Sequence, residues 1–197
     1  MKIAIIDYNA GNVQSVLFAL ERIGASAVLT SDPEEINSAD KVIFPGVGEA
    51  KNTMAYLRKT GLADVIRNLK QPTIGVCLGM QLLCQHSEEG DTDCLNIIPL
   101  KVKKFIATEA SQKIPHIGWN KFFFDHNTRL LKKNKSGDYA YFVHSYYVET
   151  GKYTTATCDY VLPFSAALQK DNFYATQFHP EKSGEVGELI LKEFINL

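Results

Sequence analysis

The chain has 197 residues and a formal net charge of −1, with 22% charged residues of both signs. This length is enough for one well-packed α/β domain and short for two, so we expect a single domain over residues 1–197. The balanced charge offers no basic face for nucleic acid, and no apolar stretch is long enough for a membrane span or a signal peptide. We expect a cytoplasmic protein.

The first half of the sequence alternates short β-rich runs with helical patterns. Asn12 is placed to cap a helix whose apolar residues share one face, and Gly24 to end that helix. Helical turns are expected at residues 54–57 and 62–69. Strands are expected at residues 3–6, 27–30, 41–44 and 72–76. Strands that alternate with helices predict a parallel sheet covered on both faces.

The second half changes character to β-branched and aromatic segments separated by polar, glycine-containing loops. This pattern predicts antiparallel hairpins added to the sheet. The segments cover residues 101–106, 121–124, 139–144, 153–157 and 173–178, and a closing helix is expected at 184–197. The predicted fold class is therefore α/β, a mostly parallel central sheet flanked by helices and extended by antiparallel hairpins.

Cys77 lies in the run G-V-C-L-G, between the strand at 72–76 and a helical pattern at 79–86. Glycines on both sides permit a sharp strand-to-helix turn, because side chains there would crowd a strained backbone. The turn places the sulfur at a helix N-terminus, where the helix dipole favours the thiolate. On this motif alone, a buried structural thiol remains an open alternative.

The segment H-P-E at residues 179–181 favours a catalytic role for Cys77 over a structural one. Period-two geometry would point His179 and Glu181 to the same side of a strand end, the usual location of sites in parallel sheets. A carboxylate beside a histidine fixes its tautomer and stabilises the imidazolium. With Cys77 these are the parts of an activated cysteine nucleophile, and a surface turn becomes the weaker alternative.

A second glycine-rich turn, P-G-V-G at residues 45–48, follows the strand at 41–44. It lacks the third glycine of a dinucleotide-binding fingerprint, so we predict no cofactor there. Its backbone N–H groups would suit a nearby oxyanion if the strands at 41–44 and 72–76 are neighbours. A plain strand-to-helix connection is the alternative.

The other cysteines carry weaker signals. Cys84 is expected in the core, and Cys94 and Cys158 show no partner. Because no C-x-x-C pair or metal-binding spacing occurs and nothing suggests secretion, we expect reduced thiols and no metal.

The remaining histidines and the tryptophan leave more than one interpretation open. His86, His116 and His126 are expected at caps or on the surface, and Trp119 in the core or at an interface. Residues 144–146, H-S-Y, end an aromatic strand, and packing and function are both open for them.

Together these motifs resemble the class I glutamine amidotransferases, and within them the family of glutaminase subunits of imidazole glycerol phosphate synthase. G-x-C-x-G combined with H-P-E is shared by the whole class. One departure is Asn9, where glycine is common in the family; Asn tolerates the left-handed conformation, so the turn should survive. The narrower match rests on residues 7–12 (D-Y-N-A-G-N), 45–48, 79–83, 87–90 (S-E-E-G), 115–120 (P-H-I-G-W-N), 144–147 and 179–183.

The resemblance implies a role for each matching residue. Cys77 would be the nucleophile, His179 the general base and acid, and Glu181 the group that orients the histidine. The N–H groups of Leu78 and Val47 would form the oxyanion hole, that of Val47 after its peptide reorients. Residues that would hold glutamine are Gly48, Gln81, Glu89, Ser145 and Tyr146. Residues that would face a partner are Asn12, Trp119 and Lys182.

The implied reaction is hydrolysis of L-glutamine to glutamate and ammonia, without a cofactor. The ammonia would pass to a (β/α)₈-barrel cyclase subunit in a heterodimer, which makes imidazole glycerol phosphate and an aminoimidazole carboxamide ribonucleotide in histidine biosynthesis.

Two alternatives to this function remain. A related amidotransferase subunit could serve pyridoxal phosphate synthesis or a nucleotide-sugar or glycan pathway; segments 87–90 and 115–120 disfavour the first of these and leave the second open. A non-catalytic binding subunit is disfavoured, because Cys77, His179 and Glu181 are all present.

Overall fold

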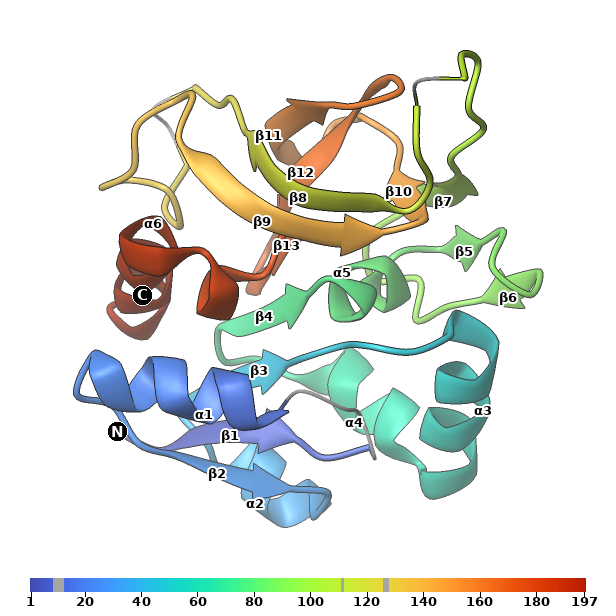
Figure 1. Cartoon of the computed structure of the whole chain (residues 1–197). Coiled ribbons are helices and arrows are strands. Elements are labelled where there is room, and N and C mark those ends of the chain that lie inside the picture. Colours follow the sequence, from blue (N-terminus) through green and yellow to red (C-terminus); the bar gives the residue numbers. More distant parts are fainter. Residues whose placement is uncertain (9–12, 111, 126–127) are drawn as a thin grey trace.

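A computed structural model describes residues 1–8, 13–110, 112–125 and 128–197. Asn12, predicted to cap the first helix, and His126 lie outside these described residues. Within them, seven strands form one mixed sheet in the order β11-β12-β13-β4-β3-β1-β2 (Figure 1). The parallel members are β1 (Ile3–Ile6), β2 (Ala27–Thr30), β3 (Lys41–Phe44), β4 (Thr73–Val76) and β13 (Phe173–Thr176); β11 (Thr154–Asp159) and β12 (Pro163–Lys170) are antiparallel. The predicted α/β class with a mostly parallel sheet is confirmed.

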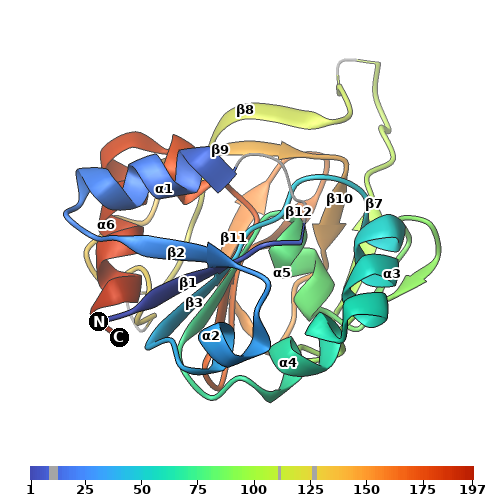
Figure 2. The same ribbon diagram turned by 90° about the horizontal axis from the view of Figure 1, so that it is seen from below.

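Helices cover both faces of this sheet, which explains why β1, β3, β4 and β13 are buried along their whole length. On one face lie α1 (Val13–Arg22) and α6 (Gly184–Ile195), which share a core with Ile3, Ile5 and Ile74. Figure 2 shows these two helices opposite α2 and α4. The other face is covered by α2 (Pro33–Asn37), α3 (Ala50–Thr60), α4 (Leu62–Asn68) and α5 (Leu78–Leu83).

The end of α1 shows why the predicted helix stops where it does. Gly24 has φ +79, and its N–H donates to the carbonyl of Glu21, while the N–H of Ala25 donates to Leu20. These bonds satisfy carbonyls that a helix leaves unpaired at its end, and the positive φ suits glycine. The predicted role of Gly24 is confirmed.

Two smaller sheets correct the prediction for the second half. Among the residues that the structure describes, only β11 and β12 extend the central sheet as antiparallel strands, and β13 pairs with β4 in parallel. The other strands form separate sheets. One contains β10 (Tyr146–Val148), β7 (Lys101–Lys104), β5 (His86–Ser87) and β6 (Thr92–Asp93), and the other contains β8 (His116–Lys121) and β9 (Tyr139–His144).

Two predicted boundaries were also wrong. The strand expected at residues 121–124 lies earlier, as β8, and Phe122 follows it with a fully buried ring. The helix expected to reach residue 86 ends at Leu83, because the chain turns there and His86 pairs with Asp93 across β5 and β6. No helix in the described residues is both long and apolar enough to cross a bilayer.

Candidate active site

Cys77 occupies a strained turn between β4 and α5. Its backbone has φ 52 and ψ −107, a left-handed φ that non-glycine residues rarely adopt. Its N–H donates to the carbonyl of Thr176 on β13 at 2.8 Å, which fixes the turn to the centre of the sheet. Strain of this kind persists where the surrounding structure holds a side chain in a required direction. The predicted strand–turn–helix context is thus present.

Glycines allow the two loops around Cys77 to pack backbone against backbone. A Cβ on Gly79 would overlap the carbonyl oxygen of Phe44, and one on Gly46 would overlap the amide nitrogen of Gly79. A Cβ on Gly75 would press on Leu83 and Gly79. The prediction that side chains would crowd this turn is confirmed. Because β3 pairs with β4, the loop at 45–48 lies beside Cys77, as expected.

His179 and Glu181 form a buried hydrogen-bonded pair. The Nδ1–H of His179 donates to Oε1 of Glu181 at 2.7 Å, and their side chains are 2% and 3% exposed. The predicted geometry was wrong in one respect. Strand β13 ends at Thr176, and Glu181 lies in a short 3-10 helix, η1 (Pro180–Lys182), that directly follows His179. The tight turn brings the two side chains together in place of strand alternation.

Strand β9 holds this turn in place. The N–H of His179 donates to the carbonyl of Tyr141 at 2.9 Å. The hydroxyl of Ser183 donates to the His179 carbonyl at 2.7 Å and accepts from the Tyr141 N–H at 3.0 Å. The imidazole is therefore fixed at its backbone as well as at Nδ1.

The charge state of His179 depends on its neighbours. Burial disfavours the imidazolium, but the negative charges of a Cys77 thiolate and of Glu181 outweigh burial and raise the pKa of His179 to about 10. Its Nε2 is buried and has no formed hydrogen bond among the described residues. The negative charges beside it therefore favour the imidazolium form of His179.

A pocket of about 310 Å³ opens over Cys77 and His179. Its volume suits a small metabolite. Nine of the predicted residues line it: Val47, Gly48, Cys77, Leu78, Gln81, Glu89, Ser145, Tyr146 and His179. Glu181 lies behind His179 and does not line this pocket. Pro115, Val143 and His144 also line it.

The loop at 45–48 rests with a carbonyl where the oxyanion hole was predicted. The N–H of Leu78 donates to the carbonyl of Gly46 at 3.4 Å. Since a trans peptide points its C=O and N–H in opposite directions, the N–H of Val47 faces away from Leu78. The buried hydroxyl of Tyr8 donates to the adjacent carbonyl of Pro45 at 2.5 Å.

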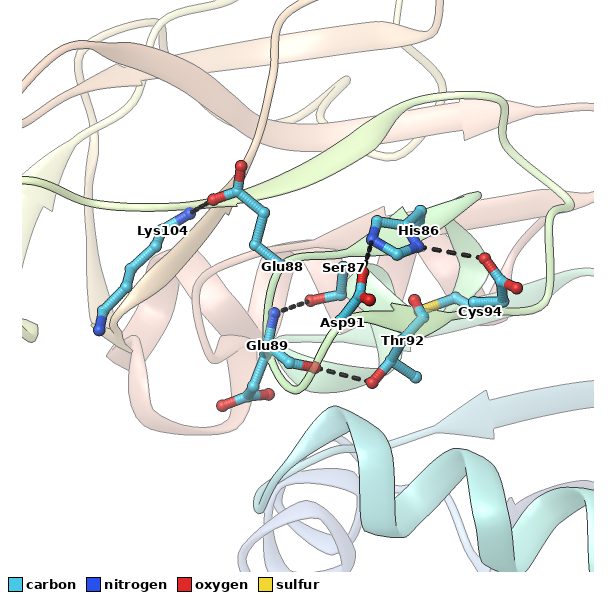
Figure 3. A network of polar contacts seen from close by, with 9 residues as sticks. His86, Ser87, Glu88, Glu89, Asp91, Thr92, Cys94 and Lys104 are labelled. Carbon is cyan, nitrogen blue, oxygen red and sulfur yellow. Dashed lines mark hydrogen bonds and ion pairs between the residues drawn. The ribbon is translucent and has the colours of Figure 1, made fainter.

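Glu89 reaches the pocket from the turn between β5 and β6 (Figure 3). Its N–H donates to Oγ of Ser87 at 3.1 Å, and the hydroxyl of Thr92 donates to its carbonyl at 2.7 Å. Its Oε2 accepts from the N–H of Ala50, the first residue of α3, at 2.8 Å. Burial raises the pKa of Glu89, and this N–H partly opposes the rise. The S-E-E-G turn thus places a carboxylate at the pocket wall.

His116, predicted at a cap or on the surface, is instead buried against the site. Its Nδ1 lies 3.0 Å from Nε2 of His144, and Asn120 Nδ2 lies 3.3 Å from its Nε2. The Nδ1 of His144 donates to the carbonyl of Tyr146 at 2.7 Å, which leaves Nε2 of His144 as the acceptor. Burial lowers the pKa of His116 to about 4 and of His144 to about 3, so both rings are neutral.

Two of the three residues predicted to face a partner are exposed, and the third is not described. Trp119 is 56% exposed on β8, beside the 60% exposed Ile117, so it belongs to the surface and not to the core. Lys182 is exposed at the end of η1. Asn12 lies outside the described residues.

The remaining cysteines and His86 stand apart from the pocket. Burial raises the pKa of Cys94 and of Cys158 to about 12, and that of Cys84 well above its ordinary value. His86 lies between the carboxylates of Asp91 and Asp93 on the β5–β6 hairpin (Figure 3). Across the described parts of the chain, no group of three or more His, Cys, Asp or Glu is arranged to hold a metal ion.

A cysteine on a strained turn and a buried histidine–carboxylate pair meet at the end of parallel strands, the arrangement that an activated cysteine nucleophile requires. The family model "Glutamine amidotransferase class-I" matches residues 4–197, and the chain belongs to this family.

Within this family, the chain can be compared with individual relatives and solved structures. The chain is 55% identical over 197 residues to the imidazole glycerol phosphate synthase subunit HisH of Bacteroides thetaiotaomicron, and equally to that of Bacteroides fragilis, covering all of each chain. The crystal structure of a putative GMP synthase protein from Thermoplasma acidophilum superposes with a TM-score of 0.75 at 18% identity, covering 100% of this chain and 92% of the other. That structural likeness shows the fold.

Proposed function

We propose that this chain is the glutaminase subunit of an imidazole glycerol phosphate synthase in histidine biosynthesis. It hydrolyses glutamine to glutamate and ammonia. The observation that carries the proposal is the pocket that Cys77 and His179 line together, with Glu181 bonded to His179 from behind. The full-length similarity to HisH subunits supports the assignment within the family.

In the proposed reaction the Cys77 thiolate attacks the side-chain amide carbon of glutamine and forms a tetrahedral intermediate. The carbon–nitrogen bond then breaks, and the departing nitrogen takes a proton from Nε2 of His179. Ammonia and a glutamyl thioester result. A water molecule gives a proton to His179 and attacks the thioester, which releases glutamate and restores the thiolate. Glu181 keeps the proton of His179 on Nδ1 and stabilises its charged form.

The charged backbone end of glutamine must be held away from the reacting amide. We assign Glu89 to the substrate ammonium, because its carboxylate lines the pocket and is fixed by the Ala50 N–H. Gly48, Ser145 and Tyr146 form the rest of that wall. Both N–H groups of Gln81 bond within the protein, so we assign its contact with glutamine to its side-chain oxygen.

The Gly46–Val47 peptide gives this site a resting state. With the Gly46 carbonyl on the Leu78 N–H, neither predicted donor is available to an oxyanion. Rotation of this one peptide would release the Leu78 N–H and aim the Val47 N–H at the same point. Gly46 makes the rotation inexpensive on one side of the peptide. We propose that a partner favours the rotated state.

The partner we propose is a (β/α)₈-barrel cyclase, since ammonia released into water would be protonated and lost as a nucleophile. The exposed pair Ile117 and Trp119 and the cation of Lys182 are the candidate contacts. We also propose one amidotransferase domain over residues 1–197, acting in the cytoplasm, where four free buried thiols suit a reducing environment.

The test is to isolate the protein that co-purifies with the tagged chain and to assay the pair for glutamine-dependent formation of imidazole glycerol phosphate. Cys77→Ala is the control: it should lose activity with glutamine and keep activity with an added ammonium salt. A different co-purifying synthase, for pyridoxal phosphate or a sugar nucleotide, would redirect the proposal to that acceptor. Wild-type hydrolysis absent with every partner would overturn the enzymatic assignment.

A further inference from the structure

Gln177 is a buried amide beside the nucleophile that the sequence motifs did not single out. It follows β13, is fully buried, and its backbone N–H donates to the Ala166 carbonyl at 2.8 Å. Thr176 pairs with Val76 in parallel register at the ends of β13 and β4. The residues that follow them, Gln177 and Cys77, therefore lie side by side. The side-chain nitrogen of Gln177 lies 3.6 Å from the Cys77 sulfur.

The orientation of this amide follows from its neighbours. The Tyr146 carbonyl can only accept, so the group of Gln81 that faces it at 2.9 Å is the NH₂. The same nitrogen lies 3.0 Å from the Gln177 side chain, which must therefore present its oxygen. That leaves the NH₂ of Gln177 facing the sulfur.

His144 supports this assignment because it also bonds to the Tyr146 carbonyl, from which the orientation of both amides was deduced. It is neutral and donates its Nδ1–H to the same Tyr146 carbonyl, at 2.7 Å, while its Nε2 accepts from His116. The carbonyl therefore receives two hydrogen bonds and cannot rotate toward another partner. Amides linked in this way hold one another in a single arrangement.

We propose that Gln177 is a positioning residue that donates a side-chain N–H to the Cys77 sulfur and favours its thiolate over its thiol. A hydrogen bond to the charged form of a group stabilises that form. A thiol accepts hydrogen bonds weakly, so the bond gains most of its strength on ionisation. The inference rests on the proposed role of Cys77 as the nucleophile and deepens it.

The other groups near the sulfur act differently. The Val143 carbonyl, at 3.8 Å, can only accept, and so it stabilises the protonated thiol. The titratable groups that act on the sulfur are His179, with Glu181 behind it, and the hydroxyl of Tyr8. Among these neighbours Gln177 supplies an N–H donor that keeps its proton over the working pH range.

The test follows the rate of Cys77 alkylation by iodoacetamide from pH 5 to 10 in the full chain. Gln177→Met keeps the side-chain length and removes the donor, and Gln177→Asn withdraws it from reach. Either variant should move the midpoint of the profile up by about one pH unit, with about tenfold slower alkylation at pH values below the midpoint. The midpoint belongs to the Cys77–His179 pair, so the comparison is between profiles.

Thr176→Val is the matched control. Thr176 precedes Gln177 directly. The substitution removes a buried hydroxyl that donates to the Phe178 carbonyl at 3.0 Å and has no contact with the sulfur. Its profile should match the wild type, and a Cys77→Ala chain corrects for the other cysteines. Folded Gln177 variants with an unmoved midpoint would overturn the proposal, as would an equal shift in Thr176→Val. Neither result affects the nucleophile assignment, which is tested separately by labelling of Cys77 with a glutamine-like electrophile.

Discussion

The carbonyl oxygen of Gly46 accepts the hydrogen bond of the Leu78 amide across 3.4 Å, at the mouth of the turn that carries the nucleophile. The bond is long for an N–H···O pair, so little is lost when it opens. A tetrahedral intermediate at Cys77 would compete for the same N–H. In the proposed mechanism, Cys77 is therefore in place, whereas the N–H groups of Leu78 and Val47 are not yet free to hold an oxyanion.

We expect the isolated chain to hydrolyse glutamine slowly. Losing one oxyanion donor typically costs about 10²–10³ in rate, and partner binding should restore at least that factor. The measurement is glutamate release by the chain alone, with a cyclase partner, and with partner plus its nucleotide ligand. Equal rates under all three conditions would rule out the peptide switch and leave the cysteine mechanism untouched.

Cys77→Ala should abolish hydrolysis, by about 10⁴-fold or more, and leave the protein folded. Its thermal unfolding should stay close to that of the wild type, because a small residue replaces a small one. An electrophilic glutamine analogue should label Cys77 alone, since burial raises the pKa of Cys94 and Cys158 to about 12. Peptide mapping by mass spectrometry checks this. Label on Cys84, Cys94 or Cys158 would contradict the assignment.

His179→Asn should depress turnover nearly as far as Cys77→Ala, because the two residues act as a unit. Glu181→Gln should be at least about tenfold less damaging, since it removes the charge that helps raise the pKa of His179 but keeps the imidazole. Steady-state glutaminase assays with the partner present compare the two. A more severe defect in Glu181→Gln than in His179→Asn would show that the roles are assigned wrongly.

Because the fold keeps His144 neutral, the free energy of unfolding should decrease in mild acid. Its folded-state pKa, about 3, lies below the ordinary 6.5, so the unfolded chain binds more protons between these values and stability falls as the pH falls. From pH 7 to pH 5 this one residue should cost about 2 kcal/mol. Urea unfolding of wild type and His144→Gln at both pH values measures it. If the two proteins lose equal stability, the ring is not held neutral.

Gly79→Ala should disrupt the site, because its Cβ would overlap the Phe44 carbonyl in a backbone contact that cannot move aside. We expect a loss of more than about 3 kcal/mol, or a displaced loop with no activity. Gly24→Ala is the control: its φ is also positive, but its Cβ would meet open space, so about 1–2 kcal/mol is expected. Similar unfolding free energies for both variants would contradict the contact.

Much of this site could be predicted from sequence, because local rules determine its central part. Glycines flanking Cys77 and the short spacing of His179 and Glu181 carry their chemistry within a few residues. The strands β1, β3 and β4 are mostly apolar runs, so their burial was also visible.

What sequence could not provide was pairing between distant strands. Gln177 lies beside Cys77 only because β13 inserts next to β4 in parallel, whereas the aromatic pattern favoured hairpins. His116 was missed because β8 buries His116 and partly buries Asn120 while it leaves Ile117 and Trp119 exposed, the reverse of the usual alternation. Strand β12 starts with proline and is rich in small residues, so no strand pattern marked it.

The β8–β9 ribbon gives the exposed tryptophan a direct route to the catalytic imidazole. Trp119 faces Tyr141 across the ribbon, and the Tyr141 carbonyl accepts the amide proton of His179. A ribbon of two strands has fewer neighbouring strands to hold it than the seven-stranded sheet, so it is expected to open more readily. In the proposed complex, a partner seated on Trp119 would therefore suppress the opening of the strand that anchors His179. Binding at this outer surface would then prolong the lifetime of the aligned imidazole without displacing its mean position.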